Sequence, residues 1–256
     1  MSETVSAIVK GGVFWAGQVL IVVVLSGLFL RRRYRACPSF VLYLLATLIG
    51  DLLLILGPRH LNPESSLFGL LGAKGFYSRD FWMLKELTLN LLKFAVALEL
   101  AFRTFRSFPG ARSTARSVML LLVAVTLVSV VTVAAQVSAI DLEDRVNQII
   151  GRLQPRVLNG TVWLFTGMAV LILWYRLPVD RFHKAILTGF VPYLLIFTIG
   201  LNALDSYGWN IRDLINYVHT TAYLLLLAYW AWEAWAPPAP PTVARGPAPV
   251  LERQAV

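Results

Sequence analysis

One stretch of the sequence, from Phe81 to Arg106, is long and apolar enough to cross a bilayer as a helix, yet it carries ionisable side chains along its length. Each ionised group placed in the hydrocarbon costs roughly 2.5–3.5 kcal/mol on insertion scales, so such groups normally face a protein interior or water. A helix that carries Lys85, Glu86 and Lys93 therefore cannot be a lipid-facing anchor. We expect it to be the central helix of a bundle, with its polar stripe turned inward.

Long apolar runs dominate the rest of the chain, which is 57% hydrophobic and only 14% charged. Soluble globular domains rarely have such a composition. The runs are each close to the ~20 residues that a membrane-spanning helix needs. The sequence therefore predicts an all-α polytopic membrane protein, with a seven-transmembrane-helix bundle over residues 1–236. The expected spans are 13–30, 40–56, 81–105, 118–136, 157–175, 185–204 and 214–235.

Lysine and arginine are distributed unevenly over the links between these spans. If the amino terminus is outside, the inner links and the tail hold 13 basic residues and the outer side holds 8. Cytoplasmic loops carry the basic excess in membrane proteins. We therefore expect the amino terminus outside and the carboxyl terminus in the cytoplasm. The same clustering explains the formal charge of +9, so no nucleic-acid partner is expected.

Three segments outside the spans have their own character. Residues 138–153 show apolar positions at helical spacing, which predicts an amphipathic helix on the outer surface or over the mouth of the bundle. The long link 57–80 contains an apolar stretch that can dip into the membrane interface. Residues 237–256 are rich in proline, which predicts a disordered cytoplasmic tail.

Polar residues of several spans fall at a similar depth, in the outer half of the bundle, whereas the inner half is aliphatic and aromatic. Glu86, Asn90 and Lys93 share one face of the third helix, because their spacing is i, i+4, i+7. Such clustering favours an outward-facing polar cavity that binds a small molecule. The alternative is a set of hydrogen bonds that only hold helices together. The candidate ligand-binding residues are Asp51, Glu86, Asn90, Lys93, Asn202, Asp213, Asn216 and His219.

Two charge pairs are expected within the bundle. A buried lysine tends to lose its proton unless a carboxylate lies nearby, so Lys93 is predicted to pair with Asp51 or, as the weaker candidate, with Asp213. Near the inner surface, Glu99 and Arg103 stand in the favourable i, i+4 order.

The sequence holds no recognisable catalytic motif. Its three histidines lie in different regions, which gives neither metal-ligand spacing nor paired haem ligands. The seventh run has no lysine, so retinal binding is not expected. The single cysteine, Cys37, excludes an intrachain disulfide. We expect no cofactor and no metal, and an enzymatic function ranks last among the possibilities.

In helix count and orientation, the chain resembles the membrane sensor parts of some bacterial signalling proteins. The resemblance implies a multi-pass protein of a bacterial inner membrane that binds a small-molecule ligand. Because the chain carries no attached output domain, it would signal through a separate cytoplasmic or membrane protein partner. The alternatives are a small-solute or ion transporter and an accessory or structural subunit of a membrane complex.

Overall fold

The computed structural model describes residues 3–60, 79–106, 142–175, 179–207 and 209–237, together with nine single residues between 113 and 132. All regular structure in these residues is helical. The elements are α1 (Glu3–Leu30), η1 (Arg33–Arg35), α2 (Pro38–His60), α4 (Arg79–Arg106), α6 (Leu142–Tyr175), α7 (Arg181–Tyr207), η2 (Trp209–Ile211) and α8 (Arg212–Trp235). The predicted all-α fold is confirmed for this part of the chain.

Six of the seven predicted spans each lie within one of these α-helices. The third span, 81–105, agrees with α4 within two residues at either end. The first and second are longer than predicted, because α1 begins at Glu3 and α2 continues to His60. The fourth span, 118–136, falls largely outside the described residues, as do link residues 61–78 and tail residues 238–256.

The predicted surface helix before the fifth span needs a correction. Residues 142–153 are helical, but they form the first part of α6, which continues without a break to Tyr175. Residues 138–141 lie outside the described residues. At 1.5 Å per residue, the 34 residues of α6 extend for about 51 Å, well beyond the ~30 Å of a bilayer hydrocarbon core. The segment therefore extends the fifth helix rather than lying separately across the bundle.

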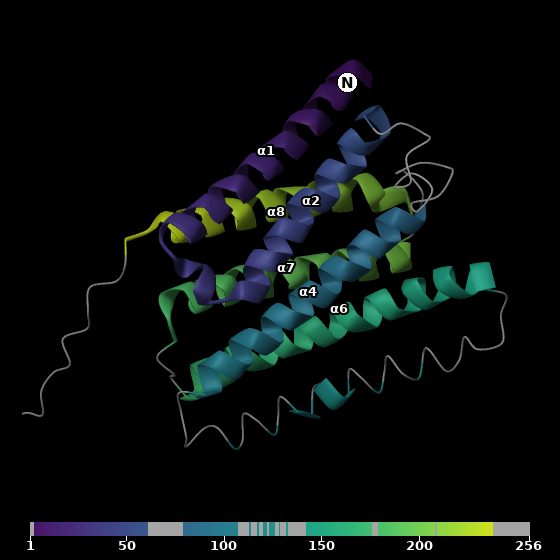
Figure 1. Ribbon diagram of the computed structural model, residues 1–256. Helices are drawn as coiled ribbons and strands as arrows, with labels where there is room; N and C mark the ends of the chain where they lie inside the picture. The colour runs from purple at the N-terminus through teal and green to yellow at the C-terminus, as the bar shows by residue number, and fades with distance from the viewer. Residues whose placement is uncertain are drawn as a thin grey trace, which may run out of the picture.

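The six long helices form a closed ring. Going round it, α1 packs against α2, α2 against α4, α4 against α6, α6 against α7, α7 against α8, and α8 against α1. Figure 1 shows α4 and α6 running in the same direction, so Arg106 and Leu142 lie at opposite ends of the ring. The expectation of a central third helix is corrected, since α4 is one member of this ring.

Aromatic side chains fill one half of the ring interior. Phe40 of α2 and Phe190 of α7 each lie with their ring centroid 4.8 Å from Trp230 of α8. Phe165 of α6 stacks on Phe190 at 5.0 Å. All four side chains are fully buried, and aromatic pairs at these distances attract beyond the area that they bury. We call these four residues the aromatic cluster.

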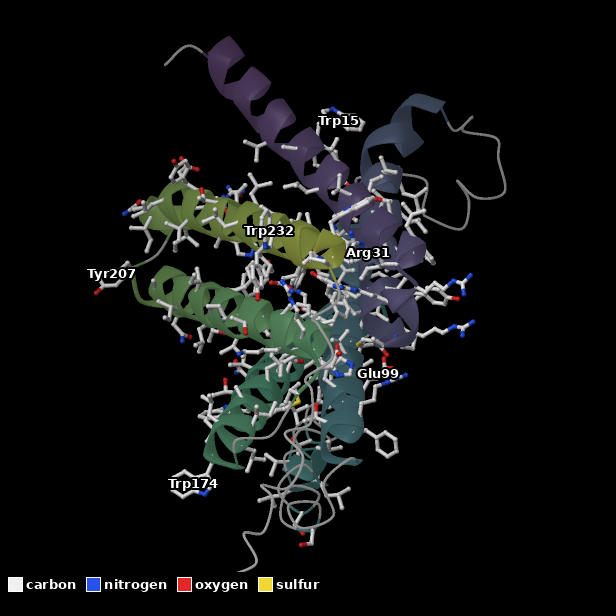
Figure 2. All side chains as sticks on the ribbon, turned by 90° about the vertical axis from the view of Figure 1, so that its left-hand side faces the viewer. Trp15, Arg31, Glu99, Trp174, Tyr207 and Trp232 are labelled. Atoms are coloured by element: carbon white, nitrogen blue, oxygen red, sulfur yellow. The ribbon has the colours of Figure 1, made fainter. Side chains whose placement is uncertain are left out.

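The outer surface of the ring is apolar along much of its length. In the part of the chain that the structure describes, three helical segments are long and apolar enough to cross a membrane: Gly11–Leu30, Val157–Trp174 and Arg181–Gly200. Large apolar side chains project outward from the ring, with Trp174 80% exposed and Phe102 67% exposed. Trp15, Trp174 and Tyr207 extend away from the helices in Figure 2. Such extensive apolar surface is typical of a protein that contacts a membrane or an apolar surface of another protein.

One end of the ring holds Arg31–Arg35 and is here called the arginine end. Hydrogen bonds and an ion pair join its arginines to the last turn of α8. Arg33 donates hydrogen bonds to the carbonyl oxygens of Glu233 at 2.6 Å and Ala236 at 2.8 Å. Arg31 donates to Ala236 at 2.7 Å, and Arg181 binds the Glu233 carboxylate at 2.9 Å. Cations stabilise a helix C-terminus by satisfying its free carbonyls and opposing its dipole. The arginines thus hold the point where the chain leaves α8 (Figure 2).

Candidate functional site

An ion pair joins α2 and α4 in the half of the ring away from the arginine end. Lys85 donates to one carboxylate oxygen of Asp51 at 2.8 Å, and Gln18 of α1 donates to the other at 3.0 Å. The Lys85 ammonium also lies 3.6 Å from the carboxylate of Glu86. The side chains of Lys85 and Asp51 are only 12% and 17% exposed. Three helices therefore meet at Asp51.

Lys93 lies deeper in the ring and is only 7% exposed, next to Asn90 at 2%. Its ammonium donates to the side-chain oxygen of Asn90 at 3.1 Å and lies 5.9 Å from the ring centroid of Tyr43. Among the described residues, no carboxylate lies within ion-pairing distance of Lys93. The predicted pair of Lys93 with Asp51 or Asp213 is therefore wrong.

The register of two antiparallel helices explains this correction. Lys85 lies opposite Asp51, and Lys93 lies opposite Tyr43, so one contact follows the other by eight residues on both helices. Eight helical residues extend for about 12 Å. A lysine side chain does not cover that distance, even when it extends toward the same end of the bundle. Asp51 therefore pairs with the lysine at its own depth.

His219 of α8 completes the polar lining at the depth of Lys93. Its Nε2 atom lies 2.8 Å from the hydroxyl of Tyr193 on α7, and its ring lies 4.7 Å from that of Phe197. Tyr223, one turn further along α8, packs with its ring 5.7 Å from Tyr193. The charge of Lys93 acts on His219 through space. Side chains from α2, α4, α7 and α8 thus face one another around the ring interior.

We call this set of side chains the interior polar cluster. It takes in Gln18, Tyr43, Asp51, Lys85, Glu86, Asn90, Lys93, Tyr193, His219 and Tyr223.

Three of the candidate residues stay apart from this cluster. Asn202 of α7 is exposed, and so are Asp213 and Asn216 of α8. Asp213 lies in the first turn of α8, where the positive end of the helix dipole stabilises a carboxylate. The structure brings Glu86, Asn90 and Lys93 together in the interior polar cluster. It does not bring Asn202, Asp213 and Asn216 to them.

Sequence reasoning also missed several members of the cluster. Gln18 is a large polar residue in an otherwise apolar run, which is a usable signal because such residues seldom face lipid. Tyr193 lies near the middle of its span, away from the interfacial depth where tyrosine is common. Tyr43 lies in the first turn of its span and gives no such signal. Lys85 was recognised as a charge of the third helix, but not as part of the site.

Two buried polar atoms in the cluster are without hydrogen-bond partners among the described residues. One is the side-chain oxygen of Gln18. The other is the hydroxyl of Tyr223, which lies near the Tyr43 hydroxyl. Buried polar groups of native proteins are nearly always paired with protein, water or ligand. The cluster therefore has unused hydrogen-bonding capacity on both its Asp51 side and its Lys93 side.

A second set of polar contacts lies at the arginine end. The predicted Glu99–Arg103 pair is confirmed, with a distance of 2.8 Å. The same carboxylate accepts the backbone N–H of Ser39 at 2.9 Å and lies 3.5 Å from the thiol of Cys37. Burial raises the pKa of Cys37 to about 12, and the nearby Glu99 charge adds to the shift. These contacts pin the start of α2 to α4.

Metal chemistry finds no support in the part of the chain that the structure describes, where no group of three or more His, Cys, Asp or Glu side chains has a metal-binding arrangement. Comparisons with protein-family models, with curated proteins and with solved structures give no match. Function is therefore inferred from the residues of this chain alone.

Proposed function

We propose that this chain is a seven-helix, multi-pass membrane sensor that binds a small molecule from the outside and signals through a separate protein partner. The fourth span of this arrangement is the apolar run 118–136. The ring supports it, because α4 ends at the arginine end while α6 begins at the opposite end. The chain between them has to pass from one end of the ring to the other.

The orientation in this proposal places the arginine end in the cytoplasm. Arg31–Arg35, Arg103 and Arg181 lie at that end together, as expected for the cytoplasmic side of a membrane protein. The amino terminus is then outside, and the chain after Pro237 lies inside. A bacterial inner membrane is the location that fits this charge distribution and the sensor resemblance.

The observation that carries the proposal is the change in the ring interior from one end to the other. The ionised members Asp51 and Lys85 of the interior polar cluster lie toward the end away from the arginine end. The aromatic cluster lies toward the arginine end, and Tyr43 stands between the two, with its ring 5.5 Å from that of Phe190. A binding site that is polar toward the outside and closed toward the cytoplasm suits a sensor. A transporter needs a path to both sides of the membrane in turn.

The partner would act at the arginine end. There, arginines from the α1–α2 link and from α7 bind the last turn of α8. Further up the same helix, His219 and Tyr223 belong to the interior polar cluster. A ligand that moves α8 would thus change contacts at the cytoplasmic end. Coupling of this kind requires that the ligand bind two arrangements of α8 with different affinity.

An accessory subunit is the second candidate, and the paired Asp51 and Lys85 favour it. In that case, the interior polar cluster only holds helices together and contains no water-filled site.

Cysteine labelling of intact cells tests the proposal. In a Cys37→Ala background, we expect a membrane-impermeant thiol reagent to label a His219→Cys variant from outside and not from the cytoplasmic side of inverted vesicles. Labelling from both sides would favour transport, and protection from both sides would favour the accessory subunit. Ser138→Cys should react from outside and Ser117→Cys only in inverted vesicles, and the reverse pattern would overturn the orientation.

A further inference from the structure

Lys93 has hydrogen-bonding capacity that the described residues leave unused. An ammonium group carries three donors, and only the contact with the Asn90 side-chain oxygen, at 3.1 Å, engages one of them. Tyr43 offers its ring rather than an acceptor atom, at 5.9 Å. The residue is only 7% exposed, so its ammonium group has a large desolvation cost unless further acceptors approach it. This position calls for an acceptor that carries negative charge.

The nearest carboxylates are already engaged at a different depth. Asp51 accepts hydrogen bonds from Lys85 and Gln18 with its two oxygens. Glu86 lies 3.6 Å from Lys85 and acts on Lys93 only through space. Lys85 therefore engages both acids of the interior polar cluster, whereas Lys93 faces tyrosines and a histidine.

The groups that surround Lys93 are mainly donors. The hydroxyls of Tyr43 and Tyr223 can each donate, and the Tyr223 hydroxyl is buried without a partner among the described residues. The amide nitrogen of Asn90 adds two more donors, because its oxygen is the atom that accepts from Lys93. The aromatic rings of Tyr193 and Phe197, both on α7, pack against the imidazole of His219. This environment matches a ligand with acceptor oxygens and a small apolar body.

We propose that Lys93, with Asn90, Tyr43 and Tyr223, binds the carboxylate group of a small organic anion. This inference rests on the proposed sensor function and names the chemical class of its ligand. A charge-assisted hydrogen bond from a buried ammonium to a carboxylate is stronger than a bond between neutral groups. The tyrosine hydroxyls would complete the hydrogen bonds of the carboxylate, and the aromatic rings would contact its apolar part.

Thermal unfolding of the full chain in lipid nanodiscs tests this proposal with sodium benzoate as the probe, at constant ionic strength. A ligand that binds the folded chain stabilises it by RT ln(1 + L/Kd), where L is the free ligand concentration, so its unfolding temperature rises with ligand concentration and with affinity. We expect benzoate to raise it and the neutral isostere benzamide to leave it unchanged. In Lys93→Met, the dissociation constant for benzoate should rise about 30-fold or more, as for loss of one partner of a buried charge pair.

A second variant guards against misfolding of Lys93→Met. Asn90→Asp is close to isosteric and places an internal carboxylate beside Lys93, so it should abolish the benzoate response while the chain stays folded. Lys184→Met removes an exposed cation at the arginine end and should respond like the parent chain.

Equal responses to benzoate and benzamide, or an unchanged dissociation constant in Lys93→Met, would overturn the proposal. A response to phosphate or chloride but not benzoate would replace the organic anion with an inorganic one. If no anion acts but the His219→Cys variant is labelled from outside, the anion inference fails while the sensor proposal stands.

Discussion

The ammonium of Lys85 lies 2.8 Å from the carboxylate of Asp51, across the interface between α2 and α4. Gly50, the residue before Asp51, allows this approach, because a Cβ atom at Gly50 would lie 3.0 Å from the Lys85 side chain. The pair fixes which turns of the two helices lie opposite each other. It thereby places Lys93 beside Tyr43 and Glu99 beside the start of α2.

The first prediction concerns the coupling of this pair. Removing either charge leaves the other largely buried without its partner, so Lys85→Met and Asp51→Leu should each lower the free energy of unfolding by about 3 kcal/mol. The double variant should lose much less than the sum of the two. Thermal unfolding in detergent measures all three. As a control, Lys93→Met combined with Asp51→Leu should be additive, and coupling in that second pair instead would contradict the observed register.

The positions of the helices could largely be predicted from the sequence, because an apolar run in lipid has to satisfy its backbone hydrogen bonds within itself, as a helix. The ends of the helices were harder to predict. Hydropathy placed a boundary near the charged residues Arg152 and Arg156, whereas α6 continues through them. The reason is that hydropathy marks where the solvent changes, and backbone hydrogen bonding need not stop there.

The polar face of α4 could be predicted, but its partners could not. Helical spacing places Glu86, Asn90 and Lys93 on one face, and the burial of Asn90 and Lys93 confirms that this part of the face turns inward. Which residue lies opposite each one depends on the register between helices. Register follows from close contacts such as Gly50 with Lys85, and a single sequence does not reveal such a contact.

The second prediction tests the close packing of α7 against α8 at Gly189. A Cβ atom at Gly189 would lie 2.5 Å from the Cδ1 of Leu226 and 2.6 Å from the Nε1 of Trp230. The leucine can rotate away, but Trp230 is held by the aromatic cluster and by a 3.3 Å hydrogen bond to Ala185. Gly189→Ala should therefore lower the free energy of unfolding by about 1–3 kcal/mol.

The matched control for Gly189 is Gly12→Ala in α1, where an added Cβ meets no atom within 4 Å. It should be neutral or stabilise the chain by up to about 1 kcal/mol, because alanine favours helix more than glycine does. Equal loss of thermal stability in the two variants would show that α7 and α8 do not meet as closely as described.

The third prediction concerns the hold of Arg33 on the end of α8. Burial lowers the pKa of Arg33, with Arg31 and Arg181 adding to the effect, but two carbonyl acceptors compensate for its desolvation. A hydrogen bond to a charged group contributes about 1.5–3 kcal/mol. In Arg33→Gln, amide hydrogen exchange in the last turn of α8 should therefore be about tenfold faster or more. Mass spectrometry of the exchanged peptides measures this rate.

Arg35 supplies the control for that experiment. It is exposed, and its described hydrogen bond is to the hydroxyl of the adjacent Tyr34 at 3.3 Å. Arg35→Gln removes the same charge from the same link and should leave exchange in α8 unchanged. Equal acceleration in both variants would point to a general charge effect and away from the contacts of Arg33.

The last prediction concerns the reactivity of Cys37. Burial and the Glu99 carboxylate raise the pKa of this thiol from 9.0 to about 12, so the folded chain keeps it protonated at pH 8. Because the thiolate is the reactive form, its fraction at that pH is lower in the folded chain by a factor on the order of a thousand. Alkylation by N-ethylmaleimide, followed by intact mass, should therefore be very slow until the chain unfolds. Arg35→Cys in a Cys37→Ala background should react readily, since position 35 is exposed. The raised pKa also means that the protonated thiol favours the folded state, and that this contribution is complete below about pH 9 and is lost as the pH rises toward 12. Fast alkylation of Cys37 in the folded chain at pH 8 would show that the start of α2 does not pack against α4 as described.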